Sequence, residues 1–196
     1  MIHKHSLTAR ALCGIMGLSA FCTPFTAYAA YERDASGVYR MDDGTAIENV
    51  YARGIDVSHW KQDINWNAVA ADDVSFVMLG TRYQGQVDPY FRINAEGAHS
   101  AGIALGAYIY SYATTPEMAE EEADFVLDLI KDYPISYPVA FDVEDNGTLG
   151  TLTPSQVSEI INAFCQKIED ADYYPIVYAN DNWLANKIDL SSIDYD

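Results

Sequence analysis

Two acidic residues at the end of an apolar run carry the strongest chemical signal in this sequence. The apolar residues 139–141 lead into Asp142-Val143-Glu144. Because side chains two positions apart leave the same face of a strand, Asp142 and Glu144 are expected to lie together, and the pKa of one of them should rise. Glycoside hydrolysis uses such a pair, one protonated acid beside one charged carboxylate. A solvated strand end and a Mg²⁺ or Ca²⁺ site are the alternative interpretations.

A third carboxylate lies in the first predicted strand, residues 54–58. Asp56 stands between Ile55 and Val57, so its side chain should leave the opposite face of the strand. If the two apolar residues face helices, Asp56 points into a barrel, where a carboxylate is costly unless it is paired or functional. A capping aspartate at a strand end is the alternative. His59 follows and is interpreted as a loop contact rather than a catalytic base.

Aromatic residues are expected at the ends of the same strands. Tyr108 and Tyr110 share one face of a predicted strand, Tyr178 ends another, and Trp183 follows it. Sugar rings stack on aromatic faces, and phenol hydroxyls hydrogen-bond to sugar polar groups. These four residues are therefore candidates for a sugar groove, with burial in the core as an equal alternative.

Strands and helices alternate from Tyr51 onward, which predicts how these residues are positioned. The predicted strands are 54–58, 74–79, 103–112, 138–144 and 175–179; the predicted helices are 65–71, 90–101 and 181–187, with two more beginning after Thr115 and Thr153. This alternation implies an α/β fold with right-handed β-α-β units and a parallel sheet, as a closed barrel or an open sheet. No G-x-G-x-x-G motif or P-loop follows a strand, so the usual nucleotide-binding signature is lacking.

The composition suits one extracellular globular domain. The chain has 196 residues and a net charge of −18, from 11 Lys+Arg against 29 Asp+Glu. No long basic run appears, so nucleic acid is not expected as a partner. Lys4 and Arg10 precede an apolar run and an Ala-Tyr-Ala cleavage motif, which predicts a secretory signal peptide over residues 1–29. Residues 30–50 are expected to be an extension or linker, and residues 51–196 the domain that carries the candidate catalytic residues.

Cleavage after residue 29 would leave a secreted or wall-associated protein without a membrane anchor. It would also leave Cys165 as the single cysteine, interpreted as a small buried core residue. The sequence contains no H-x-x-x-H or H-E-x-x-H motif and no G-x-S-x-G elbow. We therefore expect neither a metal nor a cofactor.

Several motifs follow one another in an order known from one enzyme family. They are Gly54-Ile55-Asp56-Val57-Ser58-His59-Trp60, a segment around Arg82 and Gly85, the spaced residues Asp88, Phe91, Asn94, Ala98, Ala101 and Gly102, Gly106-Ala107-Tyr108, Asp142-Val143-Glu144, and Pro175 to Tyr178. This ordered set resembles glycoside hydrolase family 25, the lysozymes that cleave peptidoglycan glycan strands.

The resemblance implies an irregular TIM-like (β/α) barrel, of which this chain holds about the first five β/α units. It also implies hydrolysis of the β-1,4 bond between N-acetylmuramic acid and N-acetylglucosamine. Glu144 matches the proposed general acid, and Asp142 and Asp56 match the carboxylates that orient or stabilise charge. Both a carboxylate nucleophile and help from the substrate's acetamido group stay open. The residues that would shape the sugar groove are Tyr108, Tyr110, Tyr178, Trp183, Gln84 and Arg82.

Two departures keep other functions open. The family's domain normally continues through three more strand regions, and residues 191–196 look like the lead-in to another strand, so we expect a C-terminally incomplete domain. A strong negative charge is also unexpected for an enzyme that attacks an anionic wall. The alternatives are a non-catalytic peptidoglycan- or carbohydrate-binding relative and a family 18 chitinase-like hydrolase. The second is disfavoured because Tyr137, Pro138 and Ala140 stand where that family has acidic residues.

Overall fold

The computed structural model describes residues 31–41 and 43–195. The chain divides into two compact units, Met1–Tyr51 and Ala52–Asp196. In the first unit, β1 (Tyr31–Arg33) pairs antiparallel with β2 (Tyr39–Met41). The sequence predicted no strand there, because three-residue strands are too short to show a period. The expected signal peptide, residues 1–29, lies outside the described residues.

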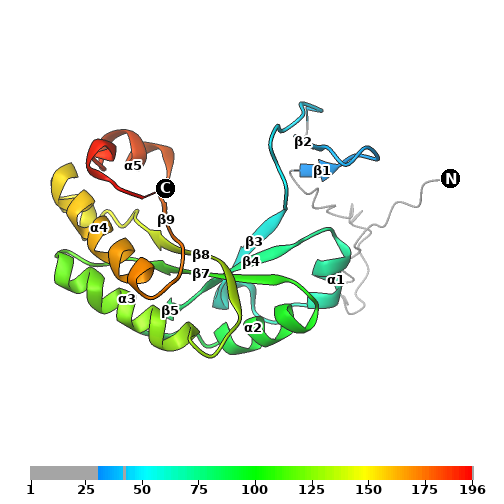
Figure 1. Cartoon of the computed structure of the whole chain (residues 1–196), viewed down its shortest axis with the longest axis horizontal. Coiled ribbons are helices and arrows are strands. Elements are labelled where there is room, and N and C mark those ends of the chain that lie inside the picture. The colour runs from blue at the N-terminus through cyan, green and yellow to red at the C-terminus, as the bar shows by residue number, and fades with distance from the viewer. Residues whose placement is uncertain (1–30, 42, 196) are drawn as a thin grey trace, which may run out of the picture. The chain divides into compact units, whose positions relative to one another are not determined.

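Five parallel strands form the sheet of the second unit (Figure 1). They are β3 (Gly54–Val57), β4 (Phe76–Gly80), β7 (Ala104–Tyr110), β8 (Ile135–Asp142) and β9 (Pro175–Tyr178). The order is β3-β4-β7-β8-β9, so each strand pairs with the next main strand along the chain, and β3 and β9 are the edges. The predicted α/β class with a parallel sheet is confirmed.

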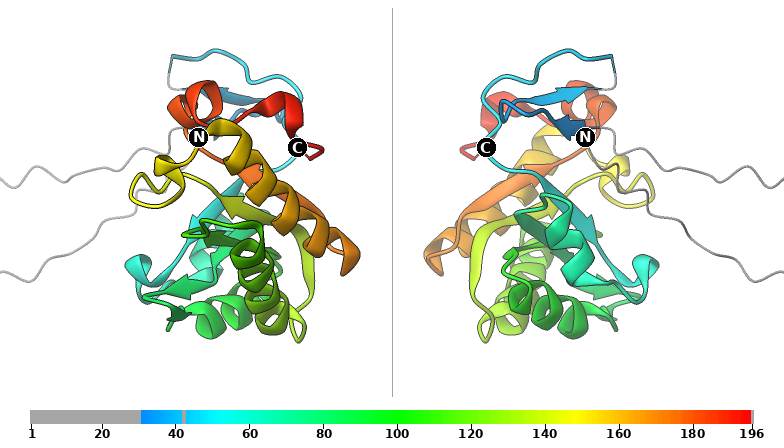
Figure 2. Two further views of the ribbon diagram at one scale, coloured as in Figure 1. Left: turned by 90° about the vertical axis from the view of Figure 1, so that its left-hand side faces the viewer. Right: turned by 90° about the vertical axis from the view of Figure 1, so that its right-hand side faces the viewer.

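Helices connect these strands or follow the last of them, and two of the helices start at the capping residues seen in the sequence. They are α1 (Trp66–Ala71), α2 (Phe91–Ser100), α3 (Pro116–Ile130), α4 (Pro154–Asp170) and α5 (Asp181–Asn186). Thr115 caps α3, and Thr153 forms a capping box with Gln156 at the start of α4. In Figures 1 and 2, α3 and α4 lie side by side along one face of the sheet. None of the described helices is long and apolar enough to cross a membrane.

The core lies between the sheet and these helices. Alternate strand residues point toward the helices and are fully or almost fully buried: Val77, Leu79, Leu105, Ala107, Ile109, Val139 and Phe141. The ring of Phe141 stacks on that of Phe164 from α4, with centroids 4.1 Å apart. Cys165 is also buried, as predicted, and burial raises the pKa of its thiol to about 12. Because strand side chains alternate, the other strand residues face away from the helices.

Two segments differ from the sequence prediction. A hairpin of β5 (Arg82–Tyr83) and β6 (Gln86–Val87) follows β4, and its two-residue strands carry no periodic signal. Residues 191–195 form no strand, although the sequence suggested a lead-in to one. Leu190–Ser192 form a 3₁₀ turn, because the Asp189 carboxylate accepts hydrogen bonds from the backbone and side chain of Ser191.

Candidate active site

A pocket of about 340 Å³ lies on the face of the sheet opposite the helices. Its lining residues are Asp56, Met78, Tyr108, Ala140, Asp142, Glu144, Ile176 and Tyr178. The strand register explains this set, since Tyr108, Ala140 and Ile176 form one row across the sheet, and Tyr110, Asp142 and Tyr178 form the next. The structure thus brings together the three carboxylates that the sequence singled out.

Asp142 is the most buried of the three carboxylates. The residue is 8% exposed, and among the described residues no donor lies within hydrogen-bond distance of its Oδ1 atom. Burial, together with the negative charges of Glu144 and Asp56, raises the pKa of Asp142 to about 7. The expected rise of one pKa in the Asp142–Glu144 pair therefore falls on Asp142.

Glu144 is half-buried and is held by a residue that follows the next strand, β9. The Asn180 side-chain amide donates a hydrogen bond of 2.8 Å to Glu144 Oε2. The Asn180 Oδ1 atom accepts from the backbone N–H of Trp183, which places Asn180 at the start of α5. Sequence reasoning missed Asn180. Its signal was an asparagine between a predicted strand end and a predicted helix start.

Asp56 lines the pocket, as the alternation along its strand predicted. It is exposed to solvent because β3 is an edge strand of the sheet. The high cost of a carboxylate inside a barrel therefore does not arise in this structure. Its side chain is free to contribute charge to the pocket.

Two of the predicted aromatic residues line the pocket. The Tyr108 hydroxyl lies close to Ser58, and burial raises the pKa of Tyr108. Tyr178 is 54% exposed, and the nearby Glu144 charge raises its pKa. Tyr110 lies outside the lining but beside it, where burial and the charges of Asp145 and Asp142 raise its pKa to about 12.

Trp183 does not belong to the groove, and that expectation was wrong. The residue is 1% exposed and packs in the hydrophobic core from α5. Its position three residues after the Asn180 cap turns the indole inward, where it fills space under the helix. It therefore cannot offer a ring face to a sugar.

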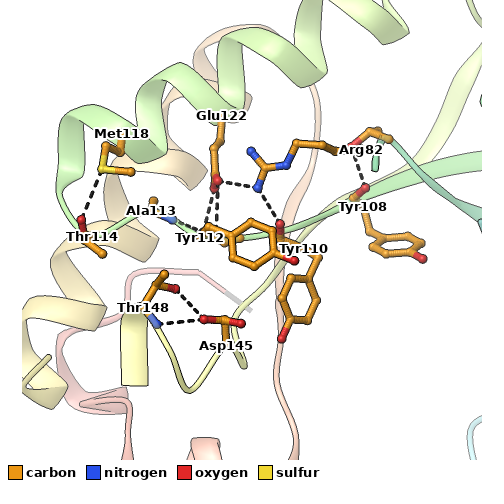
Figure 3. Close-up of polar contacts among 12 residues, drawn as sticks. Arg82, Tyr108, Tyr110, Tyr112, Ala113, Thr114, Met118, Glu122, Asp145 and Thr148 are labelled. Carbon is orange, nitrogen blue, oxygen red and sulfur yellow. Dashed lines mark hydrogen bonds and ion pairs between the residues drawn. The ribbon is translucent and has the colours of Figure 1, made fainter. Parts of the chain in front are cut away.

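Arg82 braces a strand end instead of lining the pocket (Figure 3). Its guanidinium donates to the Tyr110 carbonyl at 2.7 Å and to the Glu122 carboxylate at 2.6 Å. Glu122, on α3, is 7% exposed and also accepts from Ser111 Oγ and from the backbone N–H of Tyr112. This network fixes the end of β7. Sequence reasoning missed Glu122, which resembles any acidic residue of a helix.

Gln84 lies in the turn of the β5–β6 hairpin, outside the pocket lining. Its backbone has φ of +49°, and its side chain donates to the Tyr83 hydroxyl at 3.1 Å. A larger pocket of about 750 Å³ is lined by Val87, by residues of α2 and α3 and by the segment after α3, and it contains none of the three carboxylates. In the part of the chain that the structure describes, no three His, Cys, Asp or Glu side chains are grouped to hold a metal ion.

The carboxyl ends of parallel strands are where α/β proteins place their active sites. The parallel sheet and its acidic pocket define this chain as an α/β protein with a candidate active site of this kind. A family model described as "Glycosyl hydrolases family 25" matches residues 55–196, and the chain belongs to this family.

The relatives found by sequence and by structure agree with this assignment. Lysozyme M1 of Streptomyces globisporus is 41% identical over 63 residues, which cover 30% of this chain and 20% of that protein. The modular autolysin LytC of Streptococcus pneumoniae has a TM-score of 0.71 at 23% identity, over 85% of this chain and 41% of LytC. A family 25 glycosyl hydrolase of Bacillus anthracis has a TM-score of 0.64 at 20% identity, over 76% of this chain and 70% of that protein.

These structural likenesses confirm the TIM-like fold class. The chain spans less than half the length of the first two relatives.

Proposed function

We propose that this protein is a secreted peptidoglycan hydrolase that cleaves the β-1,4 bond between N-acetylmuramic acid and N-acetylglucosamine. The observation that carries the proposal is the pocket, which gathers Asp56, Asp142 and Glu144 beside Tyr108 and Tyr178 in a chain of family 25. The similarity to a lysozyme supports the reaction. The similarity to LytC, whose structure was also solved with a synthetic peptidoglycan ligand, supports the substrate.

The three carboxylates take different roles in this proposal. Glu144, oriented by Asn180, protonates the glycosidic oxygen as the bond breaks. Asp56, which is exposed to solvent, supplies negative charge that stabilises the oxocarbenium-like transition state. Asp142, which lies close enough to both for their charges to act on it, orients the reacting groups. Its pKa of about 7 lets it hold a proton under mildly acidic conditions.

The substrate also fixes where the protein acts. Peptidoglycan glycan strands lie outside the cytoplasmic membrane, so the protein works in the extracellular space or in the wall. The predicted signal peptide over residues 1–29 agrees with that location.

The direct test is release of new reducing ends from purified peptidoglycan by the chain from residue 30 onward. Glu144→Gln is expected to lower the rate by roughly 10²- to 10⁴-fold, the usual contribution of a general acid. Glu159→Gln is the matched control, since Glu159 is an exposed glutamate on α4, and it should leave the rate unchanged.

Two results would contradict the proposal. Equal rates for Glu144→Gln and the parent protein would remove Glu144 from the reaction. Co-sedimentation of the parent protein with insoluble peptidoglycan, without release of reducing ends, would favour the non-catalytic binding relative.

A further inference from the structure

A cluster of aromatic rings lies outside the pocket lining, on the 3₁₀ turn His59–Lys61 that follows β3 and on β5. We call His59, Trp60 and Tyr83 the aromatic platform. The ring centroid of His59 lies 4.5 Å from that of Trp60 and 3.7 Å from that of Tyr83, and the Trp60 and Tyr83 rings meet edge to face at 6.3 Å. Trp60 is 76% exposed, although a large apolar side chain gains most by being buried. The fold itself gains little from this indole.

A buried carboxylate holds the platform in place. The Asp88 side chain is fully buried, accepts a hydrogen bond of 2.8 Å from the backbone N–H of His59 and lies 2.9 Å from His59 Nδ1. Asp88 also accepts from the backbone N–H of Tyr90. These contacts agree with the interpretation of His59 as a structural contact. A rigid aromatic surface loses little entropy when a ligand binds to it.

The platform is continuous with the pocket through Ser58. Ser58 lies close to the hydroxyl of Tyr108, which lines the pocket, and His59 follows Ser58 directly in the chain. A Cβ atom at Gly80 would lie 2.9 Å from Ser58 Cβ and 3.0 Å from the Tyr108 hydroxyl oxygen. The close approach of these two side chains therefore depends on glycine at position 80. A linear glycan that fills the pocket can extend along this edge onto the platform.

We propose that Trp60, supported by His59 and Tyr83, binds an N-acetylhexosamine ring of the glycan strand outside the catalytic pocket. The apolar C–H face of a pyranose stacks on the exposed indole, and the polar edge of the sugar stays in water. The inference rests on the proposed function, because it takes the ligand to be the same glycan strand. Because this binding site lies outside the catalytic pocket, the protein is expected to prefer long glycan strands over short fragments.

The tryptophan content of the chain permits a direct test of contact. Of its three tryptophans, Trp66 and Trp183 are buried and Trp60 is exposed. In the Glu144→Gln protein, which keeps the ligand intact, peptide-free peptidoglycan glycan strands are expected to shift the emission to the blue and to protect it from iodide quenching. Trp60→Phe in the same protein should lose both effects. Unchanged emission and quenching at saturating glycan would overturn the proposal.

The kinetic test uses the parent protein and two substrate lengths. Trp60→Ala is expected to raise KM for long glycan strands roughly tenfold, equal to about 1.4 kcal/mol, without changing kcat. Trp60→Tyr should recover most of this loss, and turnover of a tetrasaccharide should not change. Ile93→Ala removes another exposed apolar side chain, on α2, and serves as the control.

The outcomes separate this inference from the proposed function. An equal loss on long and short substrates, or one that Trp60→Tyr does not recover, would mean a structural role and would overturn the subsite. If the parent protein hydrolyses nothing, the proposed function fails, and the fluorescence experiment still decides whether Trp60 contacts glycan.

Discussion

Burial deprives the Asp142 carboxylate of the hydration that would stabilise its charge, and two neighbouring carboxylates add repulsion. The same residue therefore links the chemistry of the pocket to the stability of the fold. An unfolded aspartate ionises near its ordinary pKa of 3.8, whereas Asp142 in the folded protein ionises near 7. Folding consequently competes with ionisation of this group between those two values.

We expect Asp142 to lower the stability of the fold as the pH rises. Below the unfolded pKa, Asp142 is protonated in both the folded and the unfolded state and does not lower the free energy of unfolding. The loss of unfolding free energy grows from about pH 4 to about pH 7 and is complete above that range. Asp142→Asn should therefore raise the melting temperature more at about pH 8 than at about pH 4. Thermal unfolding of both proteins at the two values measures this, and an equal shift at both would refute the assignment.

Trp183 illustrates a different role at the residue scale. Because the indole is buried in the core, Trp183→Ala is expected to destabilise the protein by about 3–5 kcal/mol through the cavity it leaves. Urea unfolding measures the loss. Trp183→Phe should retain the parent KM for glycan, while Tyr178→Ala should raise it. If Trp183→Phe raised KM without changing the stability, Trp183 would have to be counted among the residues that bind glycan.

At the scale of elements, the Arg82–Glu122 pair connects the β5–β6 hairpin, the end of β7 and α3. The two side chains are 16% and 8% exposed, so removing one partner leaves a charge with little solvent. We expect Arg82→Met to cost roughly 3–5 kcal/mol of unfolding free energy. Glu122→Leu in the same chain should recover part of that loss, because it removes the stranded carboxylate.

The exposed Lys131–Asp128 pair on and after α3 is the control for this experiment. Lys131→Met should leave the urea midpoint unchanged, because exposed ion pairs contribute little. If Arg82→Met also leaves the urea midpoint unchanged, the network does not stabilise the end of β7.

Elements with a clear period were predictable from the sequence, and short or tertiary features were not. The strand 54–58 and the helix starts at Thr115 and Thr153 followed from alternation and capping residues, which act within a few positions. The β5–β6 hairpin has strands of two residues and gives no such pattern. Trp183 and Trp60 look alike in sequence, since exposure is decided by which residues pack around them. Glu122 and Asn180 acquire their roles from partners 40 and 36 positions away.

On the scale of the whole molecule, a net charge of −18 opposes approach to an anionic wall. Salt screens this repulsion, with a Debye length of about 10 Å at 0.1 M. We therefore expect the initial rate of peptidoglycan hydrolysis to rise as sodium chloride increases from low concentration to about 0.1 M. Sucrose at equal osmolarity is the control and should have no effect. A rate that falls steadily from the lowest salt upward would contradict this explanation.

The order of the strands also bears on how the chain acquires its structure. Each main strand of the sheet finds its hydrogen-bonding neighbour in the main strand that follows it, from β3 through β9. Each pairing joins residues 22 to 36 positions apart, so it closes a shorter loop than a pairing of the first strand with the last would close. The sheet can therefore grow by one β-α unit at a time, in the direction in which a ribosome releases the chain.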